Sequence, residues 1–102
     1  MKKLFISQPM NGRSDAEIRE TREKIIQEVK ALFREDVEVL DSHFEGLSPD
    51  AKPLWCLGES LKLLAEADAA YFAKGWEKAR GCRVEHRCAR LYGTPLIIEG
   101  GN

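Results

Sequence analysis

Short apolar segments alternate with amphipathic ones along the whole chain, and this alternation limits the fold more than any other feature of the sequence. Residues 2–7, KKLFIS, form an apolar run typical of a buried strand. Similar runs recur at 37–40, 68–73 and 94–99, and helical patterns separate them. Strands that alternate with helices form a parallel sheet joined by right-handed crossovers. The sequence therefore predicts one α/β domain, residues 1–102, with helices on both faces of a small sheet.

Three segments carry the helical pattern. Residues 14–33 begin with Ser14 and Glu17, a capping box that satisfies two free amides at a helix start. A second helix is expected over 53–67, where a proline suits the first position, and a third over about 80–92, where a glycine follows as a stop. The apolar stripes of the first two helices are expected to comprise Ile18, Ile25, Val29, Leu32 and Phe33, and Leu54, Leu57, Leu61 and Leu64.

The composition argues against several classes of protein. Hydrophobic residues make up 43% and charged residues 32%, as in soluble globular domains. The net charge of −1 gives no nucleic-acid footprint. The first residues, MKKLFISQPMNG, hold too short an apolar run for a signal peptide or a membrane span. Three cysteines without a secretion signal favour reduced thiols. We therefore expect a cytoplasmic protein that binds neither nucleic acid nor membrane.

A metal site is the first alternative that the cysteines raise. Cys82 and His86 lie four residues apart on the third predicted helix. Zinc needs three or four ligands, and only His43 and Cys56 remain as further candidates. No paired Cys-x-x-Cys motif supports such a site. Neither a metal nor a cofactor is therefore expected.

Glu85 is out of place on the third predicted helix. At about 100° per residue, the four arginines of this helix fall about 140° to 160° from Glu85. Small and apolar residues lie within about 60° of it instead, namely Gly81, Cys82, Cys88, Ala89 and Tyr92. A buried carboxylate must be paired, protonated or facing a cleft. The alternative is a glutamate near a helix start that favours the helix dipole and bonds backbone amides.

The loops that follow the strands are where a ligand is expected, because ligands of parallel α/β sheets bind beyond the C-terminal strand ends. This rule selects residues 8–13, 41–44 and 74–81, and Glu85 follows the last of them. The first loop, QPMNGR, offers amides to an anion, or is an ordinary turn with its glycine at positive φ. The residues expected to border the ligand are Gln8, Pro9, Met10, Asn11, Gly12, Arg13, Asp41, Gly75, Trp76, Gly81 and Cys82.

Three further residues have a structural interpretation. Trp76 either stacks on a flat base or covers the edge of the core. His43 is either a catalytic base or a surface loop residue, and the second is expected because no carboxylate partner can be assigned to it from the sequence. Asp68 begins a strand at the opposite end of the sheet, so it is expected to cap or turn the chain there.

Two stretches, LFISQPMNG and EADAAYFAKGWEKARGCRVEHRCARLYG, resemble a family of bacterial and phage proteins. That family is similar to nucleoside 2-deoxyribosyltransferases and deoxynucleoside 5′-monophosphate N-glycosidases. The resemblance covers nearly the whole chain, is most specific from Gly75 to Ala89, and is absent over 41–58. It implies a flavodoxin-like three-layer sandwich with strand order 2-1-3-4, and a nucleoside or nucleotide as ligand. It also implies a homo-oligomer, which so small a core favours as well.

The resemblance further implies that Glu85 is the nucleophile that attacks the anomeric carbon of a 2-deoxyribosyl group. Ser60 lies near the position of an aspartate that assists the leaving base in the characterised enzymes, although serine is a poor acid at neutral pH. Phe5 and Ala79 replace a tyrosine, and a serine or aspartate, of those enzymes. The sequence therefore predicts an N-glycosidic-bond enzyme, a transferase or a hydrolase. The alternatives are a non-catalytic nucleotide-binding module of the same fold and a structural subunit without a ligand.

Overall fold

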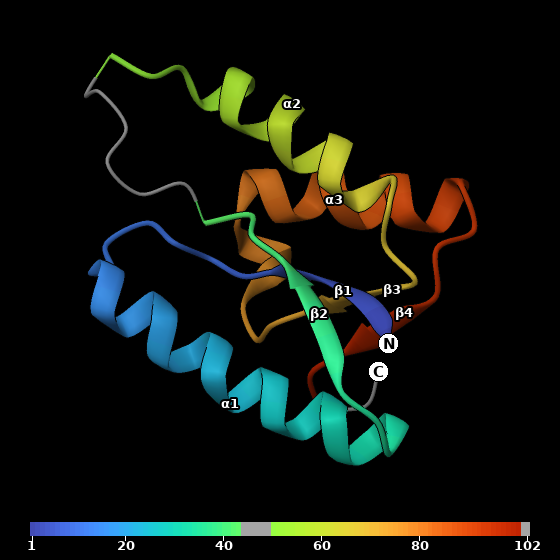
Figure 1. The fold of residues 1–102 in the computed structure, drawn as a ribbon. Helices are drawn as coiled ribbons and strands as arrows, with labels where there is room; N and C mark the ends of the chain where they lie inside the picture. The colour runs from blue at the N-terminus through green and yellow to red at the C-terminus, as the bar shows by residue number, and fades with distance from the viewer. Residues whose placement is uncertain (44–49, 101–102) are drawn as a thin grey trace.

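The computed structural model describes residues 1–43 and 50–100 and has the predicted α/β architecture (Figure 1). Along these residues the elements are β1 (Lys2–Ser7), α1 (Asp15–Phe33), β2 (Val37–Leu40), α2 (Pro53–Leu64), β3 (Ala69–Phe72), the 3-10 helix η1 (Trp76–Lys78), α3 (Arg80–Leu91) and β4 (Leu96–Ile98). All strand pairs are parallel and the strand order is β2-β1-β3-β4. This is the predicted flavodoxin-like sandwich with the predicted strand order. No helix in the described ranges has the length and apolar character needed to cross a membrane.

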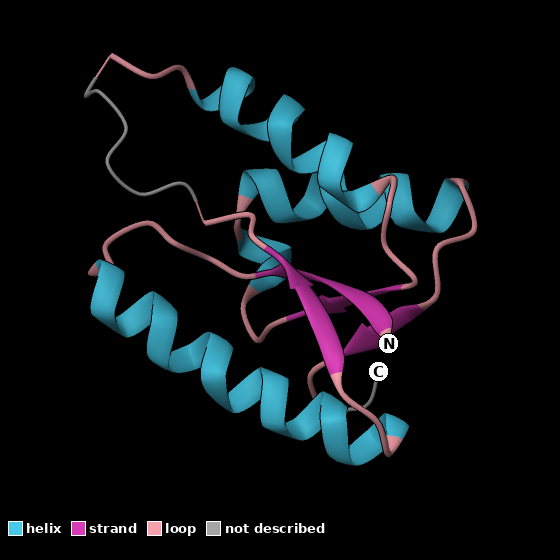
Figure 2. Cartoon of the chain, in the orientation of Figure 1, coloured by secondary structure: helices cyan, strands magenta, loops and turns pink. Residues whose placement is uncertain are grey.

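The helices cover both faces of the sheet, α1 on one and α2 with α3 on the other (Figure 2). Successive side chains of a strand point to opposite faces. In β1, Leu4 and Ile6 pack in the core beneath α1, and Phe5 packs in the core beneath α2 and α3. The last two residues of this alternation, Ser7 and Gln8, carry polar side chains into the same two layers. The central strand therefore delivers one polar group to each side of the sheet.

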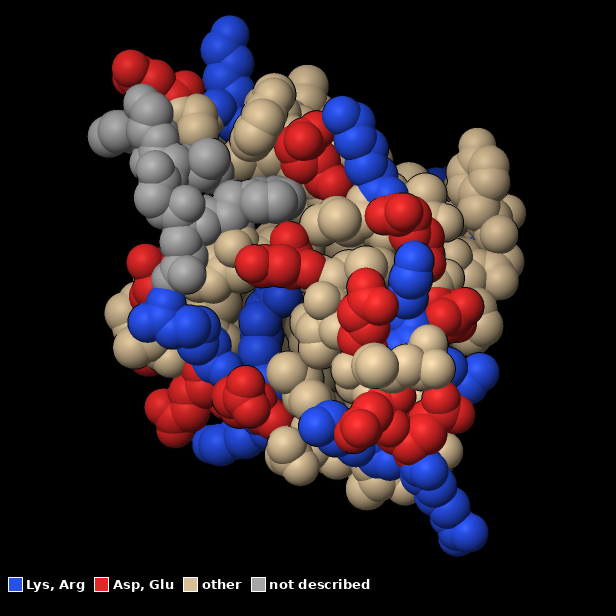
Figure 3. Space-filling view, in the orientation of Figure 1, with Lys and Arg blue, Asp and Glu red and all other residues tan. Residues whose placement is uncertain are grey.

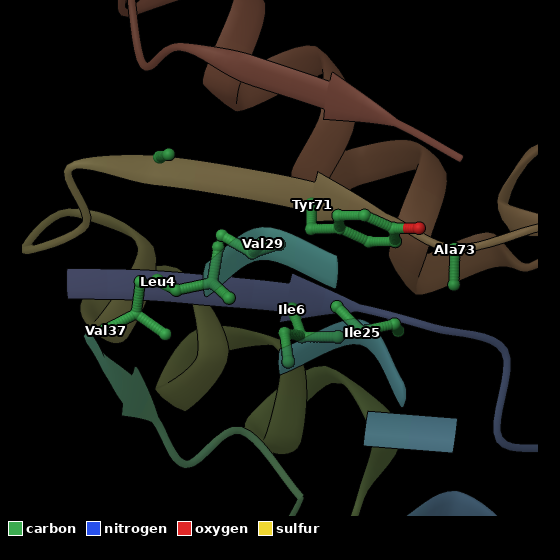
Figure 4. Packing of buried hydrophobic residues seen from close by; sticks show 8 residues of the cluster. Leu4, Ile6, Ile25, Val29, Val37, Tyr71 and Ala73 are labelled. Atoms are coloured by element: carbon green, nitrogen blue, oxygen red, sulfur yellow. The ribbon is translucent and has the colours of Figure 1, made fainter. Parts of the chain in front are cut away.

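The core beneath α1 joins side chains from four elements (Figure 4). Ile25 and Val29 of α1 meet Leu4 and Ile6 of β1, and Tyr71 of β3 lies beside them. Burial, together with the nearby Glu28 carboxylate, raises the pKa of Tyr71. The Tyr71 side chain lies beneath α1, whereas Phe5 lies in the other core. Tyr71 and Phe5 therefore lie on opposite faces of the sheet.

The predicted element boundaries agree with the structure to within three residues. The capping box is present, since Ser14 Oγ accepts from the Glu17 amide at 3.2 Å and Glu17 Oε1 accepts from the Ser14 amide at 3.0 Å. The predicted structural role of Asp68 is confirmed, because its carboxylate accepts from the Lys3 amide at 2.7 Å. The helix predicted over 53–67 ends earlier, at Leu64.

Three residues assigned to apolar stripes are exposed, and each lies near a helix end. Leu32 is 61% exposed because in the last turn of α1 it is Phe33 that packs against the core. Leu54 is 77% exposed because the first turn of α2 projects beyond the sheet (Figure 1). Tyr92 is 87% exposed because α3 ends at Leu91, so helical periodicity no longer places it. These three assignments were wrong.

Candidate functional site

A hollow of about 590 Å³ lies beyond the C-terminal end of β1 and has Glu85 in its lining. We call it the Glu85 hollow. Of the residues predicted to border a ligand, it brings together Gln8, Pro9, Met10, Asn11, Gly75, Gly81 and Cys82. The start of α2 completes it with Pro53, Cys56 and Leu57, and the segment before α3 adds Lys78, Ala79 and Arg80. The strand-end rule therefore located this hollow correctly.

Close contact between two loops shapes one side of the Glu85 hollow. Gly75 has φ +90°, a conformation that side chains disfavour, and a Cβ there would lie 3.5 Å from Pro9 Cγ. The adjoining Ala73 amide donates to the Ser7 carbonyl at 2.9 Å. The loop after β3 is thereby fixed against the loop after β1. This leads the chain through η1 into α3, on which Glu85 lies in the second turn.

Glu85 is buried at the floor of the hollow, with only 8% of its surface exposed. Its Oε1 accepts a hydrogen bond of 2.6 Å from Ser7 Oγ. Burial raises the pKa of the Glu85 carboxyl, whereas the Ser7 hydroxyl, the Arg22 guanidinium and the Ser60 hydroxyl lower it. A carboxylate held in place and only partly hydrated is the state that a nucleophile or an electrostatic stabiliser requires. Of the three states that the sequence left open for a buried Glu85, paired, protonated or facing a cleft, the structure shows a side chain that is paired with Ser7 and lines a hollow.

Arg22 is a buried charge that the sequence analysis missed. It is only 7% exposed and lies on α1, on the opposite side of the sheet from α3. Its Nε donates to Gln8 Oε1 at 2.6 Å, and its Nη2 donates to Ser42 Oγ at 2.9 Å and to the Ile6 carbonyl at 3.3 Å. Arg22 therefore fixes the end of β1 from beneath the loop that borders the hollow.

The charges of Arg22 and Glu85 support each other. Burial lowers the pKa of Arg22, while the Asp41 and Glu85 carboxylates raise it. Arginine nevertheless stays protonated in proteins. Its positive charge lowers the pKa of Glu85, although burial has the larger effect and raises that pKa overall. Neither charge is isolated, so the cost of burying each is partly offset.

Several predicted site residues do not line the Glu85 hollow. Ser60 is buried on α2 and acts on the Glu85 carboxyl through its hydroxyl. Gly12 has φ +76° in an exposed turn, and the Arg13 amide closes that turn on the Met10 carbonyl at 3.1 Å. Asp41 is exposed and accepts from the His43 amide at 3.1 Å. In the third loop, Trp76 lines a second hollow rather than this one.

Trp76 packs against the core edge, as its structural alternative predicted. Its ring stacks on His86 with centroids 4.0 Å apart and an interplanar angle of 18°. It also meets Phe72 edge-on at 5.8 Å. A short 3-10 helix orients this segment, and periodicity in the sequence does not reveal where such a turn points a side chain.

His43 has a carboxylate partner that the sequence did not reveal. Its Nε2 lies 3.0 Å from Asp15 Oδ1 at the start of α1. The two residues are far apart in the chain, so no local spacing indicates the pair. His43 does not line the Glu85 hollow. Phe44, at the end of the same predicted loop, lies outside the described residues.

The Cys82 thiol, which lines the Glu85 hollow, has limited reactivity. Burial raises the pKa of Cys82 to about 11, although the Ser7 hydroxyl acts in the other direction. The Cys82 thiol is therefore protonated near neutral pH and is a poor nucleophile. Within residues 1–43 and 50–100, no three histidine, cysteine, aspartate or glutamate side chains gather closely enough to hold a metal.

Removing the Ser7 hydroxyl should move the pKa of Glu85 further upward, because that hydroxyl favours the ionised carboxyl. Hydrogen bonds to charged groups contribute about 1.5–3 kcal/mol. The measurement is a ¹³C NMR titration of the glutamate carboxyls in wild type and Ser7→Ala. Ser14→Ala makes the same chemical change at the start of α1 and should leave the Glu85 titration unchanged. An unchanged titration in Ser7→Ala would contradict the assigned contact.

Comparison with known proteins identifies the family of the chain. Residues 2–98 match the family described as "Domain of unknown function (DUF4406)". No curated protein matches the chain significantly. The match includes every residue that lines the Glu85 hollow. Because it also covers nearly the entire sequence, the chain belongs to the DUF4406 family.

Proposed function

We propose that this protein acts on the N-glycosidic bond of a nucleoside or nucleotide, with Glu85 as the nucleophile. The observation that carries the proposal is a carboxylate with 8% exposure in the lining of a hollow of about 590 Å³. A retaining glycosyl transfer needs such a group next to the anomeric carbon, in a partly dry site. The resemblance to nucleoside 2-deoxyribosyltransferases and N-glycosidases supports the same substrate class.

The reaction proceeds in two displacements. A Glu85 oxygen attacks the anomeric carbon, the carbon–nitrogen bond breaks, and its electron pair leaves with the base. The base takes a proton from water, since burial keeps the Cys82 thiol from ionising near neutral pH. Water, or the nitrogen of a second base, then attacks the anomeric carbon and releases the Glu85 carboxylate. The attacking water or base loses its proton to solvent.

Negative charge at Glu85 also stabilises the positive charge that develops on the sugar in the transition state. The Ser7 hydroxyl holds Oε1 in position at 2.6 Å, so little reorganisation is needed when the sugar arrives. Gln8, fixed by Arg22, and the adjoining loop residues border the space in which the substrate is placed.

A non-catalytic nucleotide-binding module is the second candidate, and two positions favour it. Phe5 is fully buried in the core and offers no hydroxyl to Glu85. Ser60 contacts the carboxyl but is no acid for a leaving base. A protein with these two groups would bind the same ligands without turning them over.

A panel of nucleosides, 2′-deoxynucleosides and their 5′-monophosphates tests the two functions together. Thermal shift measures binding, because a ligand that prefers the native state raises the melting temperature. Chromatography of the same samples measures released base. Stabilisation with base release supports the enzyme, and stabilisation without release supports the binding module. If the ligands neither stabilise the protein nor release base, both proposed functions are contradicted.

The kcat/KM should fall on the acid side at a pH above 4.5, the ordinary pKa of glutamate, because burial raises the pKa of Glu85. The attacking form is the carboxylate, so activity falls as the pH drops through this raised pKa. The measurement is kcat/KM against pH, which reports the free enzyme. An acid limb at or below the ordinary value would contradict the role of Glu85.

A further inference from the structure

A second hollow, of about 760 Å³, lies against the outer side of α3. We call it the α3 hollow. Four arginines line it, Arg80, Arg83, Arg87 and Arg90, and we call them the arginine row. Their spacing of three, four and three residues keeps them on one side of the helix. At 1.5 Å per residue the row spans about 15 Å along the helix axis.

The arginine row has no ion pair among the described residues. Glu77 is the sole acid in the lining of the α3 hollow, and all four arginines are exposed. Elsewhere the pattern differs. Lys24 pairs with Glu20, Lys62 pairs with Glu59, and charges of both signs mix on the face in Figure 3. Like charges three or four residues apart destabilise a helix slightly, so this row does not serve helix stability.

Two aromatic rings share the α3 hollow with the arginine row. Trp76 and His86 both line it and are stacked 4.0 Å apart. Burial and the neighbouring Arg90 lower the pKa of His86, so its ring is neutral near pH 7. A flat neutral pair beside guanidinium groups combines the two features that bind single strands, namely stacking surfaces for bases and cations for phosphates. Guanidinium groups also suit phosphate because they donate two parallel hydrogen bonds.

We propose that the α3 hollow binds single-stranded nucleic acid, with phosphates along the arginine row and a base against the Trp76–His86 pair. An acidic peptide would satisfy the arginines but would leave the aromatic pair unused. The net charge of −1 describes the whole chain, and it conceals a row in which the cations gather on one side of one helix. The proposal does not depend on Glu85, although Arg80 lines both hollows and places them side by side.

Fluorescence polarisation with a labelled oligothymidylate of about twelve nucleotides tests this site. Each phosphate contact on a single strand contributes about −0.7 to the slope of log K against log salt, so four contacts give a slope near −3. The double variant Arg83→Ala/Arg87→Ala should reduce the slope by about 1.4 and weaken binding by about tenfold at low salt. Lys24→Ala/Lys62→Ala removes the same charge elsewhere and should change neither quantity. Stacking should quench Trp76 fluorescence, which a Trp55→Phe background isolates.

Three outcomes would overturn the proposal. One is wild-type protein that shows no salt-dependent polarisation. Another is a lysine control that weakens binding as much as the arginine variant does. The third is inorganic polyphosphate or polyglutamate that binds as tightly as the oligonucleotide, with no quenching of Trp76 by the strand. Binding should persist in Glu85→Gln, so a failure of the proposed glycosidic activity leaves this test intact.

Discussion

Glu85→Gln should lower base release or base exchange by on the order of 10³-fold or more, because it removes the attacking oxygen while keeping the shape of the side chain. The amide oxygen of glutamine still accepts from Ser7, so the loop after β1 keeps its position. Binding of nucleotides should therefore change much less than turnover. The measurement is single-turnover release of base, with enzyme in excess over substrate and above Kd, compared with thermal shift of both proteins.

The control for this variant is its stability. Burial raises the pKa of Glu85, which means that the folded protein disfavours the charge relative to water. A neutral isostere should therefore fold at least as well, and its melting temperature should equal or exceed that of wild type. Turnover that survives in a folded Glu85→Gln protein would exclude Glu85 as the nucleophile. Glu59→Gln, on the neighbouring helix, should keep full activity because Glu59 does not line the hollow.

Arg22→Met should destabilise the fold by about 3–5 kcal/mol, because breaking a buried charged network leaves its partners uncompensated. Gln8 and Ser42 would lose their hydrogen bonds, and Glu85 would lose a positive charge that favours its ionised form. Urea unfolding monitored by circular dichroism measures the loss. Lys24→Met removes an exposed cation from the same helix and should stay within about 0.5 kcal/mol of wild type.

A second substitution keeps the Arg22 prediction decisive if the methionine variant does not fold. Arg22→Lys retains the charge but loses the planar fork that reaches Gln8, Ser42 and the Ile6 carbonyl together. It should fall between wild type and Arg22→Met. A lysine variant as stable as wild type would show that the charge alone matters and that the hydrogen bonds contribute little.

Periodicity predicted the α/β class of the fold and one of the two charged side chains that are buried among residues 1–43 and 50–100. Glu85 was found because it interrupts an apolar stripe. Arg22 interrupts another in the same way, four residues after Ile18 and three before Ile25, so the same signal was present and overlooked. Helical spacing thus carries information on charges that face inward. It carries no information on the partners of these charges. Ser7 binds Glu85 from 78 residues away in the chain, and Gln8 binds Arg22 from 14 residues away.

Helical spacing in the sequence did not predict where the side chains of the loops lie. Trp76 was expected beside Glu85 and lies in the α3 hollow instead, since a 3-10 turn sets its direction. The pairing of His43 with Asp15 depends on how β2 and the start of α1 meet in space. Ser60 was named through a resemblance alone, and its contact with Glu85 depends on how α2 packs beside α3. Such contacts arise from tertiary packing rather than local pattern.

Ser7, the last residue of β1, and Gln8, which follows it, bind side chains from opposite layers, one from α3 and the other from α1. Detachment of either helical layer breaks a buried hydrogen bond at the end of β1. The end of β1 is then held less firmly, and the other layer loses part of its support. We therefore expect local unfolding of one layer to weaken the other at this point, because both hydrogen bonds depend on the same two residues of the backbone. Hydrogen exchange of the α1 and α3 amides should therefore report related opening free energies for the two layers.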